Sequence, residues 1–404
     1  MKHVLIVGCG FPQLGLIRAA RERGFATTGA DLNPQAIGVP LVDHFIQAST
    51  GDVAAIVQAF RKSGASGIAT TGSELALTTT GQAAHELGLP FYADPQTIHR
   101  CQAKDAMRAG YRAAGLPVPR FEGCSTIEQV RAFASEVGYP LVFKPAHGWG
   151  QRGVSKVNSP DGLQAAFDHA CTQSHGGGGA VVEECIVGHE VSVNGWVENG
   201  TLVSYCVTDR EVFPGTQPLG VMRSEVHPCS LDAAGVERAI DAARRGARAL
   251  GLLRGPCYSQ VAVAPDRAVL FETAARMGGG FDADVTRLAS GVDLYARLLG
   301  VAFEDPELEN AGRPDRDQPA LVRFLCPVAG TLRAIEGLEQ VRAMPGIVDA
   351  VVYPAVGSEV PALTDAAKRV GHILAIGATR QEAVARADEA QRMLRLVIDP
   401  PAAR

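Results

Sequence analysis

Two side chains near residue 270 have the types needed for metal and phosphate chemistry. Glu272 and Arg276 lie in the run Phe-Glu-Thr-Ala-Ala-Arg-Met-Gly-Gly-Gly, which ends at Gly280. A carboxylate offers oxygen ligands to a hard cation such as Mg²⁺, and a guanidinium pairs with phosphate or carboxylate oxygens. The run therefore suits a site where a metal and a nucleotide meet. The alternative is an ordinary ion pair at the end of a hairpin, and the run by itself fits both interpretations.

A lysine and a glycine-rich loop near residue 145 predict a phosphate-binding site. Lys144 lies in an apolar run from Tyr139 to Pro145, and a lysine is costly to bury unless an anion meets it. The loop that follows reads Ala-His-Gly-Trp-Gly-Gln-Arg-Gly and ends at Gly153. Its glycines let backbone amides fold over phosphate oxygens. The lysine and the loop together are stronger evidence than the loop alone, which would indicate a hairpin turn.

The pattern around these residues predicts strands that carry the chemical groups. An alternating run from Val261 to Phe271 is broken by a turn at Pro265-Asp266-Arg267, which is typical of a β-hairpin. A second apolar run, from Ala180 to Ile186, contains Glu183 and Glu184. Acids inside such a strand require partners.

The first ninety residues predict a doubly wound α/β domain. An apolar run at residues 3–7 enters a glycine turn, and a helix and a second strand ending near Asp31 follow. The dinucleotide fingerprint is matched only in part, because Gln13 occupies the third glycine position and Pro12 removes an amide. We favour a tight turn, and keep an NAD-dependent dehydrogenase as an alternative.

Ser73 and Glu74 lie where a predicted strand at residues 67–71 meets a predicted helix at residues 74–87. The carboxyl edge of an open α/β sheet binds ligands, so Glu74 is a candidate to hold a substrate ammonium group. In the alternative interpretation, which is equally favoured, Ser73 caps the helix and the Glu74 carboxylate interacts with the positive end of the helix dipole.

Composition limits the classes of partner. The 404 residues suggest two or three domains, and a net charge of -5 without basic clusters argues against nucleic acid and membrane surfaces. No apolar run reaches the ~18 residues of a membrane helix, and the start of the chain does not fit a signal peptide, so we expect a cytoplasmic protein. Nine cysteines without a Cys-x-x-Cys pair indicate reduced thiols. Small molecules are the expected partners.

Five segments in a fixed order make the sequence resemble the ATP-grasp superfamily. The ending Ala-Ala-Arg-Met-Gly-Gly is most similar to the branch of amino-acid ligases and carbamoyl phosphate synthetases. The segments are Lys104 with Asp105 and Arg108, residues 115–119, Lys144 with the glycine loop, residues 183–190, and residues 272–276.

The resemblance implies an ATP-grasp fold of mixed α/β and α+β type. An N-terminal Rossmann-like (pre-ATP-grasp) domain would cover residues 1–95. Two ATP-grasp subdomains would cover residues 96–310, with a lid at about 118–187, and a β-rich C-terminal cap would cover residues 311–404. Within these we expect helices at residues 232–250, 289–299 and 380–394, and strands at residues 321–325, 347–353 and 372–377.

The resemblance also implies ATP and Mg²⁺, or Mn²⁺, as cofactors. The metal would be held by Glu272 and Gln260, while Ala274 replaces an asparagine that the family usually has. The implied ATP-binding residues are Lys104, Lys144, His147, Gly148, Gly150, Gly153, Glu183, Glu184, Ile186 and Glu190.

The implied activity is an ATP-dependent carboxylate-amine ligase that works through an acyl phosphate, with amino acids as substrates and a homodimer as the assembly. Arg276, Lys144 and His227 would be catalytic. Substrate contacts would come from Ser73, Glu74, Arg223, His227, Arg276 and Gly279, with Glu225 as an alternate, and we expect Gly278, Gly279 and Gly280 to leave room for a substrate side chain. The alternatives are an aminoimidazole ribotide carboxylase that uses bicarbonate and a nucleotide-sensing protein.

Overall fold

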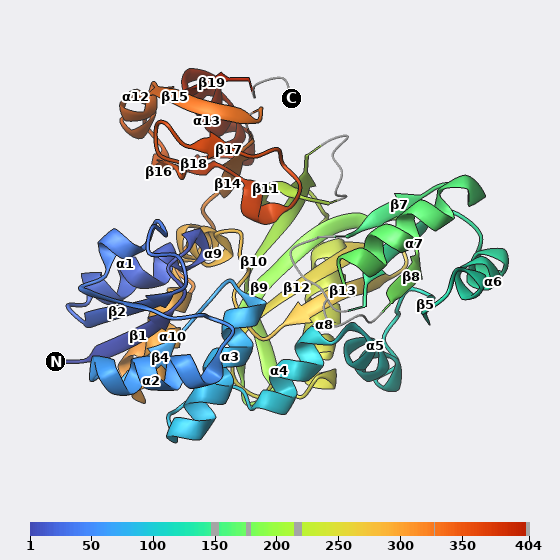
Figure 1. Cartoon of the computed structure of the whole chain (residues 1–404), viewed down its shortest axis with the longest axis horizontal. Helices are drawn as coiled ribbons and strands as arrows, with labels where there is room; N and C mark the ends of the chain where they lie inside the picture. Colours follow the sequence, from blue (N-terminus) through green and yellow to red (C-terminus); the bar gives the residue numbers. More distant parts are fainter. Residues whose placement is uncertain (147–152, 175–178, 214–219, 327, 401–404) are drawn as a thin grey trace.

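The computed structural model describes residues 1–146, 153–174, 179–213, 220–326 and 328–400. Figure 1 shows an N-terminal α/β domain, a central sheet, a lid that projects to one side, and a C-terminal domain above the central sheet. None of the helices in these ranges has the length and apolar content needed to cross a membrane.

The N-terminal domain is the predicted doubly wound α/β unit. Its four strands are parallel in the order β3-β2-β1-β4, because each is followed by a crossover that returns the chain to the same end of the sheet. The elements are β1 (His3–Val7), α1 (Leu14–Glu22), β2 (Ala26–Asp31), β3 (His44–Gln47), α2 (Val53–Ser63), β4 (Gly67–Ala69) and α3 (Glu74–Leu87).

Two helices lead from this domain to the lid. The lid is an antiparallel sheet in the order β5-β8-β6-β7, with a hydrophobic core of its own around Leu141, Phe143 and Val182. The elements are α4 (Pro95–Gln102), α5 (Lys104–Ala113), β5 (Phe121–Cys124), α6 (Ile127–Val137), β6 (Leu141–Pro145), β7 (Ser155–Val157), α7 (Leu163–Thr172) and β8 (Ala180–Glu184).

The central sheet has the order β13-β12-β9-β10-β11-β14-β18-β16. The predicted hairpin is confirmed, since β12 and β13 pair antiparallel and Val263 lies opposite Ala268. The C-terminal domain continues this sheet, because β14 pairs with β11. The elements are β9 (His189–Glu198), β10 (Thr201–Val212), β11 (Met222–His227), α8 (Ala233–Ala249), β12 (Gly255–Val263), β13 (Ala268–Ala274), β14 (Ala320–Leu325), β16 (Ile347–Val352) and β18 (Gly371–Ile376).

The prediction of one helix at residues 289–299 is wrong. The chain forms α9 (Asp282–Ser290) and α10 (Leu294–Phe303), because Gly291 ends the first with a φ of +84° and Asp293 caps the second. Helix α10 then packs on α1 and β4 of the N-terminal domain.

The remaining C-terminal elements include a second small sheet in the order β17-β15-β19. They are α11 (Pro306–Glu309), β15 (Gly330–Glu336), α12 (Leu338–Arg342), β17 (Glu359–Val360), α13 (Arg380–Met393) and β19 (Arg395–Asp399).

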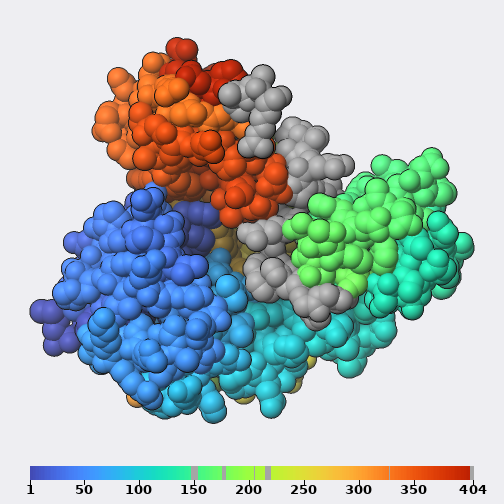
Figure 2. All heavy atoms as spheres, viewed as in Figure 1, coloured from blue at the N-terminus to red at the C-terminus, as the bar shows by residue number. Residues whose placement is uncertain are grey.

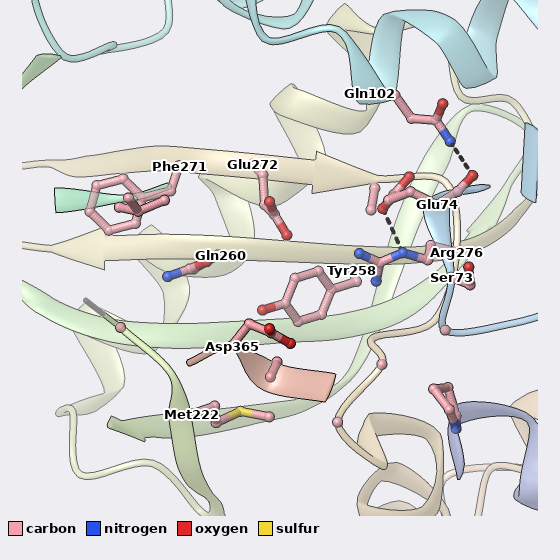
Figure 3. Close-up of a pocket in the computed structure, with 18 of the residues that line it drawn as sticks. Ser73, Glu74, Gln102, Met222, Tyr258, Gln260, Phe271, Glu272, Arg276 and Asp365 are labelled. Atoms are coloured by element: carbon pink, nitrogen blue, oxygen red, sulfur yellow. Dashed lines mark hydrogen bonds and ion pairs between the residues drawn. The ribbon is translucent and has the colours of Figure 1, made fainter. Parts of the chain in front are cut away.

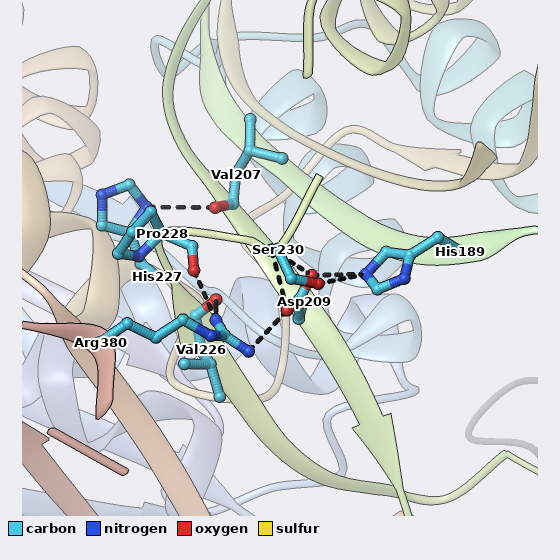
Figure 4. A network of polar contacts seen from close by, with 8 residues as sticks. All are labelled: His189, Val207, Asp209, Val226, His227, Pro228, Ser230 and Arg380. Atoms are coloured by element: carbon cyan, nitrogen blue, oxygen red, sulfur yellow. Dashed lines mark hydrogen bonds and ion pairs between the residues drawn. The ribbon is translucent and has the colours of Figure 1, made fainter. Parts of the chain in front are cut away.

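Asp209 on β10 connects the C-terminal domain to the central sheet (Figure 4). Its carboxylate accepts the backbone N–H of Ser230 at 3.0 Å and pairs with the Arg380 guanidinium at 2.6 Å. Arg380 begins α13, and it also donates to the carbonyl of Pro228. The Asp209 side chain is only 6% exposed, and the Arg380 guanidinium compensates its buried negative charge.

We expect Asp209→Ala to lower the melting temperature by roughly 6 °C. Breaking a buried ion pair costs about 3 kcal/mol, and each kcal/mol shifts melting by roughly 2 °C in a chain of this size. Differential scanning fluorimetry measures the change. Asp266→Ala, in the exposed turn between β12 and β13, is the control and should melt like the wild type. Equal melting of both variants would show that the network does not secure the C-terminal domain.

Candidate active site

A cavity of roughly 650 Å³ lies where the N-terminal domain, the lid, the central sheet and the C-terminal domain meet. Figure 2 shows the molecule hollowed between these parts. Each part contributes to the wall, for example through Gly10, Lys144, Glu272 and Arg369. Residues more than 300 positions apart therefore face the same space.

Two lysines lie at the lid end of the cavity. Lys144 is on β6, and Lys104 is the first residue of α5. Burial lowers the pKa of Lys104, and the nearby Lys144 ammonium lowers it further. Two neighbouring cations at one wall of a cavity are suited to a polyanion such as a chain of phosphates.

Glu183 on β8 is buried between two cations. Its Oε1 accepts from the Arg108 guanidinium at 3.0 Å, and its Oε2 from Lys144 Nζ at 2.5 Å. Burial alone would raise the pKa of Glu183, but Arg108 and Lys144 more than offset that effect and hold it at about 2. Arg108 also donates to the Leu270 carbonyl on β13, at 2.7 Å. One carboxylate thus joins the lid, α5 and the central sheet.

The expected need of the strand acids for partners is confirmed. Besides the Glu183 contacts, Glu184 pairs with Arg120 at 3.1 Å. Glu183, Glu184 and Ile186 all line the cavity, although the Glu183 carboxylate itself is occupied by Arg108 and Lys144.

Glu272 and Gln260 face each other across β13 and β12 and line the cavity (Figure 3). In the described part of the chain, no hydrogen bond or ion pair holds the Glu272 carboxylate. Gln260 donates its amide N–H to Glu190 at 2.9 Å, which leaves its carbonyl oxygen for another partner. These two oxygen groups fit a cation of the Mg²⁺ type.

The protein itself supplies few metal ligands. Ala274, on the same face of β13, has no ligand atom, and the described residues contain no group of three or more His, Cys, Asp or Glu side chains that could hold a metal. A cation here would complete its coordination with phosphate oxygens and water, as Mg²⁺ commonly does.

Arg276 lies beside this pair and is held by Glu74, with Nε to Oε1 at 2.6 Å (Figure 3). Its guanidinium carbon is 5.7 Å from the centre of the Tyr258 ring. Burial would lower the pKa of Arg276, but the Glu74 and Glu272 carboxylates raise it above its ordinary value. The second oxygen of Glu74 is buried without a partner among the described residues.

Ser73 caps helix α3, as one of the two interpretations of this segment predicted. Its hydroxyl accepts the Ala76 N–H at the start of α3, while Ser73 and Glu74 both line the cavity. Glu74 does more than favour the helix end, because its carboxylate orients Arg276.

Several predicted site residues lie elsewhere. His227 is the last residue of β11 and contacts the Val207 carbonyl at 3.1 Å (Figure 4). It also contacts Asp317 at 2.8 Å. Strand β11 reaches the cavity at Met222 and Glu225 instead, so neither His227 nor Arg223 lines it.

The glycine loop after β6 is only partly described. His147, Gly148 and Gly150 lie outside the described residues. Gly153 has a φ of +70°, and its neighbour Val154 lines the cavity while Gly153 does not. Glu190 lines the cavity, and its carboxylate accepts from Gln260 and from Arg210.

The expectation that three glycines leave open space is wrong. A Cβ on Gly278 would lie 2.0 Å from the Asp282 carboxylate, and one on Gly280 would lie 2.1 Å from the Met222 side chain. A Cβ on Gly279, which lines the cavity, would lie 2.7 Å from the Gly72 carbonyl oxygen. The glycines are needed because other groups pack against the backbone.

The N-terminal glycine turn also lines the cavity. The Asp31 carboxylate accepts the backbone N–H groups of Cys9 and Asn33, and the Gln13 amide bonds to Gly10 and Thr71. The acid that a dinucleotide ribose would need is therefore already used inside the turn, which supports the tight-turn interpretation.

Other residues that line the cavity were not predicted from the sequence. They are Arg210 on β10, Tyr258 on β12 and Asp282 on α9, together with Asp365 and Arg369 of the C-terminal domain. Burial and the adjacent Asp282 raise the pKa of Glu225 well above its ordinary value. The signal in the sequence was weak, because no spacing relates these residues to one another.

Comparison with known proteins supports the assignment of the fold. Residues 137–284 match the model of the ATP-grasp domain, and residues 323–399 match L-amino acid ligase C-terminal domain 2. An L-amino acid ligase from Bacillus licheniformis has a similar structure, with a TM-score of 0.82, 22% sequence identity and 99% of each chain covered.

Curated relatives are similar over part of their length. An uncharacterized protein y4rH of Sinorhizobium fredii is 28% identical over 78% of this chain and 64% of its own length. The alanine–anticapsin ligase of Bacillus subtilis is 27% identical over 57% of this chain and 53% of its own. The chain thus spans less than two thirds of these relatives.

The Glu183 contacts predict a pH dependence of stability. The pKa of Glu183 is about 2 in the folded protein, below the ordinary unfolded value of about 4.3. The ionised carboxylate therefore contributes fully to the free energy of unfolding above the unfolded pKa, and this contribution is lost as the pH falls toward 2. The shift is equivalent to roughly 3 kcal/mol. We expect the melting temperature of Glu183→Gln to be lower than that of the wild type at pH 7, and the two to converge toward pH 3.

Glu122→Gln is the matched control, since Glu122 is exposed on β5 of the same lid sheet. It should follow the wild type at every pH. A constant difference between Glu183→Gln and the wild type from pH 7 to pH 3 would contradict the ionic role of Glu183.

Proposed function

We propose that this chain, which carries an ATP-grasp domain followed by an L-amino acid ligase C-terminal domain 2, is an ATP-dependent ligase that joins the carboxylate of one amino acid to the amine of another. The observation that carries the proposal is one cavity wall that combines Lys104 and Lys144, the Glu272 carboxylate beside Gln260, and Arg276 oriented by Glu74. The similarity to amino-acid ligases supports the choice of substrates.

Each group has a role in phosphoryl transfer to a carboxylate. A substrate carboxylate oxygen attacks the γ-phosphorus of ATP, the bond to the bridging oxygen breaks, and ADP leaves with that electron pair. Lys104 and Lys144 would hold the phosphates, and their charge balances the negative charge that builds on the phosphoryl oxygens. Glu272 and Gln260 would hold Mg²⁺, which when bound neutralises phosphate charge.

The second step forms the amide bond. The amine, in its neutral form, attacks the carbonyl carbon of the acyl phosphate. The bond from that carbon to the phosphate oxygen breaks, and inorganic phosphate leaves with the electron pair and the proton that the nitrogen releases. Arg276 would stabilise the oxyanion of the tetrahedral intermediate, because its guanidinium is fixed by Glu74 and keeps its proton. A site enclosed by four parts of the chain would also limit hydrolysis of the acyl phosphate.

The proposal is tested by measuring ADP and phosphate release with MgATP over pairs of L-amino acids, with mass spectrometry of the products. We expect stoichiometric ADP, phosphate and dipeptide for at least one pair. ADP release without a condensed product, or no ADP with any pair, would contradict it.

Glu272→Ala tests the metal role within the same assay. Turnover should fall at least about 100-fold, the loss typical for removing one stabilising group at a transition state. ADP binding in EDTA should be unchanged, since Glu272 would contact the nucleotide only through the metal. Glu304→Ala, an exposed acid at the end of α10, is the control.

Nucleotide binding should be linked to protonation of Lys104. A lysine must be charged to bind phosphate, and burial together with Lys144 lowers the pKa of Lys104 in the free protein. ADP binding should therefore be accompanied by proton uptake at alkaline pH. The affinity for ADP should be constant at pH values below the pKa of Lys104 in the free protein, and should fall as the pH rises through that pKa. Calorimetry in buffers of different ionisation enthalpy measures the uptake.

Lys104→Met should remove the proton uptake, whereas Lys156→Met, at an exposed position on β7, should retain it. Equal proton uptake by both variants would assign the linkage to another group.

A further inference from the structure

Arg369 presents a guanidinium to the cavity from the C-terminal domain. It follows a short 3-10 turn (Ala366–Lys368) that Asp365 caps, between β17 and β18. The residue is only 5% exposed and lines the cavity. Its guanidinium carbon is 3.6 Å from the centre of the Phe324 ring and 5.3 Å from that of Phe11.

The contacts of Arg369 orient the group without neutralising it. Its Nε donates to the Ala366 carbonyl at 2.8 Å. Its Nη1 is buried and has no hydrogen-bond partner among the described residues, and none of the ion pairs in the described part of the chain includes Arg369. Stacking on an aromatic face leaves the in-plane N–H groups directed at a ligand, which is how arginine recognises carboxylates.

The burial of this charge is costly in the free protein. Burial lowers the pKa of Arg369 to about 10, although Tyr353 and Asp282 oppose the shift. The group still carries its charge at neutral pH, and this buried cation has no ion-pair partner among the described residues. The structure therefore contains an anion-recognition group on the side of the cavity formed by the C-terminal domain.

The chemistry of the proposed reaction identifies the anion. In the proposed reaction, the carboxylate that is activated reacts beside Arg276, and the phosphates of ATP bind at Lys104 and Lys144. The amino acid that supplies the amine keeps its own carboxylate, which needs a separate binding group. Arg369 is such a group, contributed by the C-terminal domain rather than by the lid or N-terminal domain.

We propose that Arg369 binds the free α-carboxylate of the amino acid that supplies the amine, so that the C-terminal domain selects the acceptor substrate. This inference rests on the proposed ligase function. It predicts that the acceptor is recognised by its negative charge, whereas recognition of ATP and of the activated acid is independent of Arg369.

The test compares the wild type, Arg369→Met and Arg369→Lys with an acceptor amino acid and with its C-terminal amide. For Arg369→Met, kcat/KM with the amino acid should fall roughly 10- to 100-fold, through KM, because a charge-assisted hydrogen bond is lost. The value for the amide, and KM for ATP and for the activated acid, should change less than about threefold. Arg369→Lys should restore part of the loss, and Arg333→Met, at an exposed ion pair of the same domain, should match the wild type.

Other outcomes would overturn the inference. Equal losses with the acid and the amide would indicate a packing role, and a selective rise in KM for the activated acid would assign Arg369 to the other substrate. Stronger binding of O-phosphoethanolamine than of any amino acid would assign a phosphate.

Direct binding separates this inference from the ligase proposal. Melting-temperature shifts are measured with L-amino acids and with their amides, in the presence of ADP. Stabilisation by the acids that Arg369→Met abolishes would support the inference even if no pair were turned over, in which case only the ligase proposal would fail. The inference would be overturned if Arg369→Met retained the full stabilisation by every amino acid, since only binding as the activated acid is expected to be equal in the wild type and the variant.

Discussion

The buried carboxylate of Glu183 is the interaction on which the arrangement of the site depends. It comes from the lid, and its two oxygens are occupied by Lys144 of the same sheet and by Arg108 of α5. Arg108 extends the connection to the central sheet through the Leu270 carbonyl. Removing Glu183 would leave two neighbouring cations without the carboxylate between them, and separating the lid from α5 would break the buried pair of Glu183 with Arg108 at a large cost. Lys144 is thereby held at the cavity wall that also contains Glu272.

The part of the cavity away from Lys104 and Lys144 contains buried polar atoms without partners among the described residues. These are polar atoms of Glu74 and Arg369, while the buried Glu225 and Asp282 carboxyl groups share a hydrogen bond. Each unsatisfied group costs about 1–3 kcal/mol, which is a cost that a bound ligand can recover. The Glu183 cluster is thus held by its own ion pairs, whereas Glu74 and Arg369 leave polar atoms with which a substrate can pair.

The continuous central sheet explains how the C-terminal domain can take part. Strand β14 pairs with β11, and β18 then pairs with β14, so the loop that carries Arg369 enters at a fixed register beside the strands of the core. Asp209 and Arg380 reinforce the same junction. A domain joined only by a linker could not place one guanidinium in the cavity with comparable accuracy, because relative motion of domains is the default when few contacts cross between them.

The sequence by itself determined the local features of this protein. The hairpin from β12 to β13, the parallel opening and the lysine on β6 depend on alternation, glycine turns and runs of apolar residues, which neighbouring residues specify. The order of the five segments was also sufficient to indicate the fold. Only the tertiary structure decided which of the candidate site residues lie together. Strand β11 reaches the cavity at Glu225 rather than at His227, and the space beside the glycines after Arg276 is occupied by Asp282 and Met222. Arg369 depends on a strand pairing between residues far apart in the chain, and no local pattern specifies such a contact.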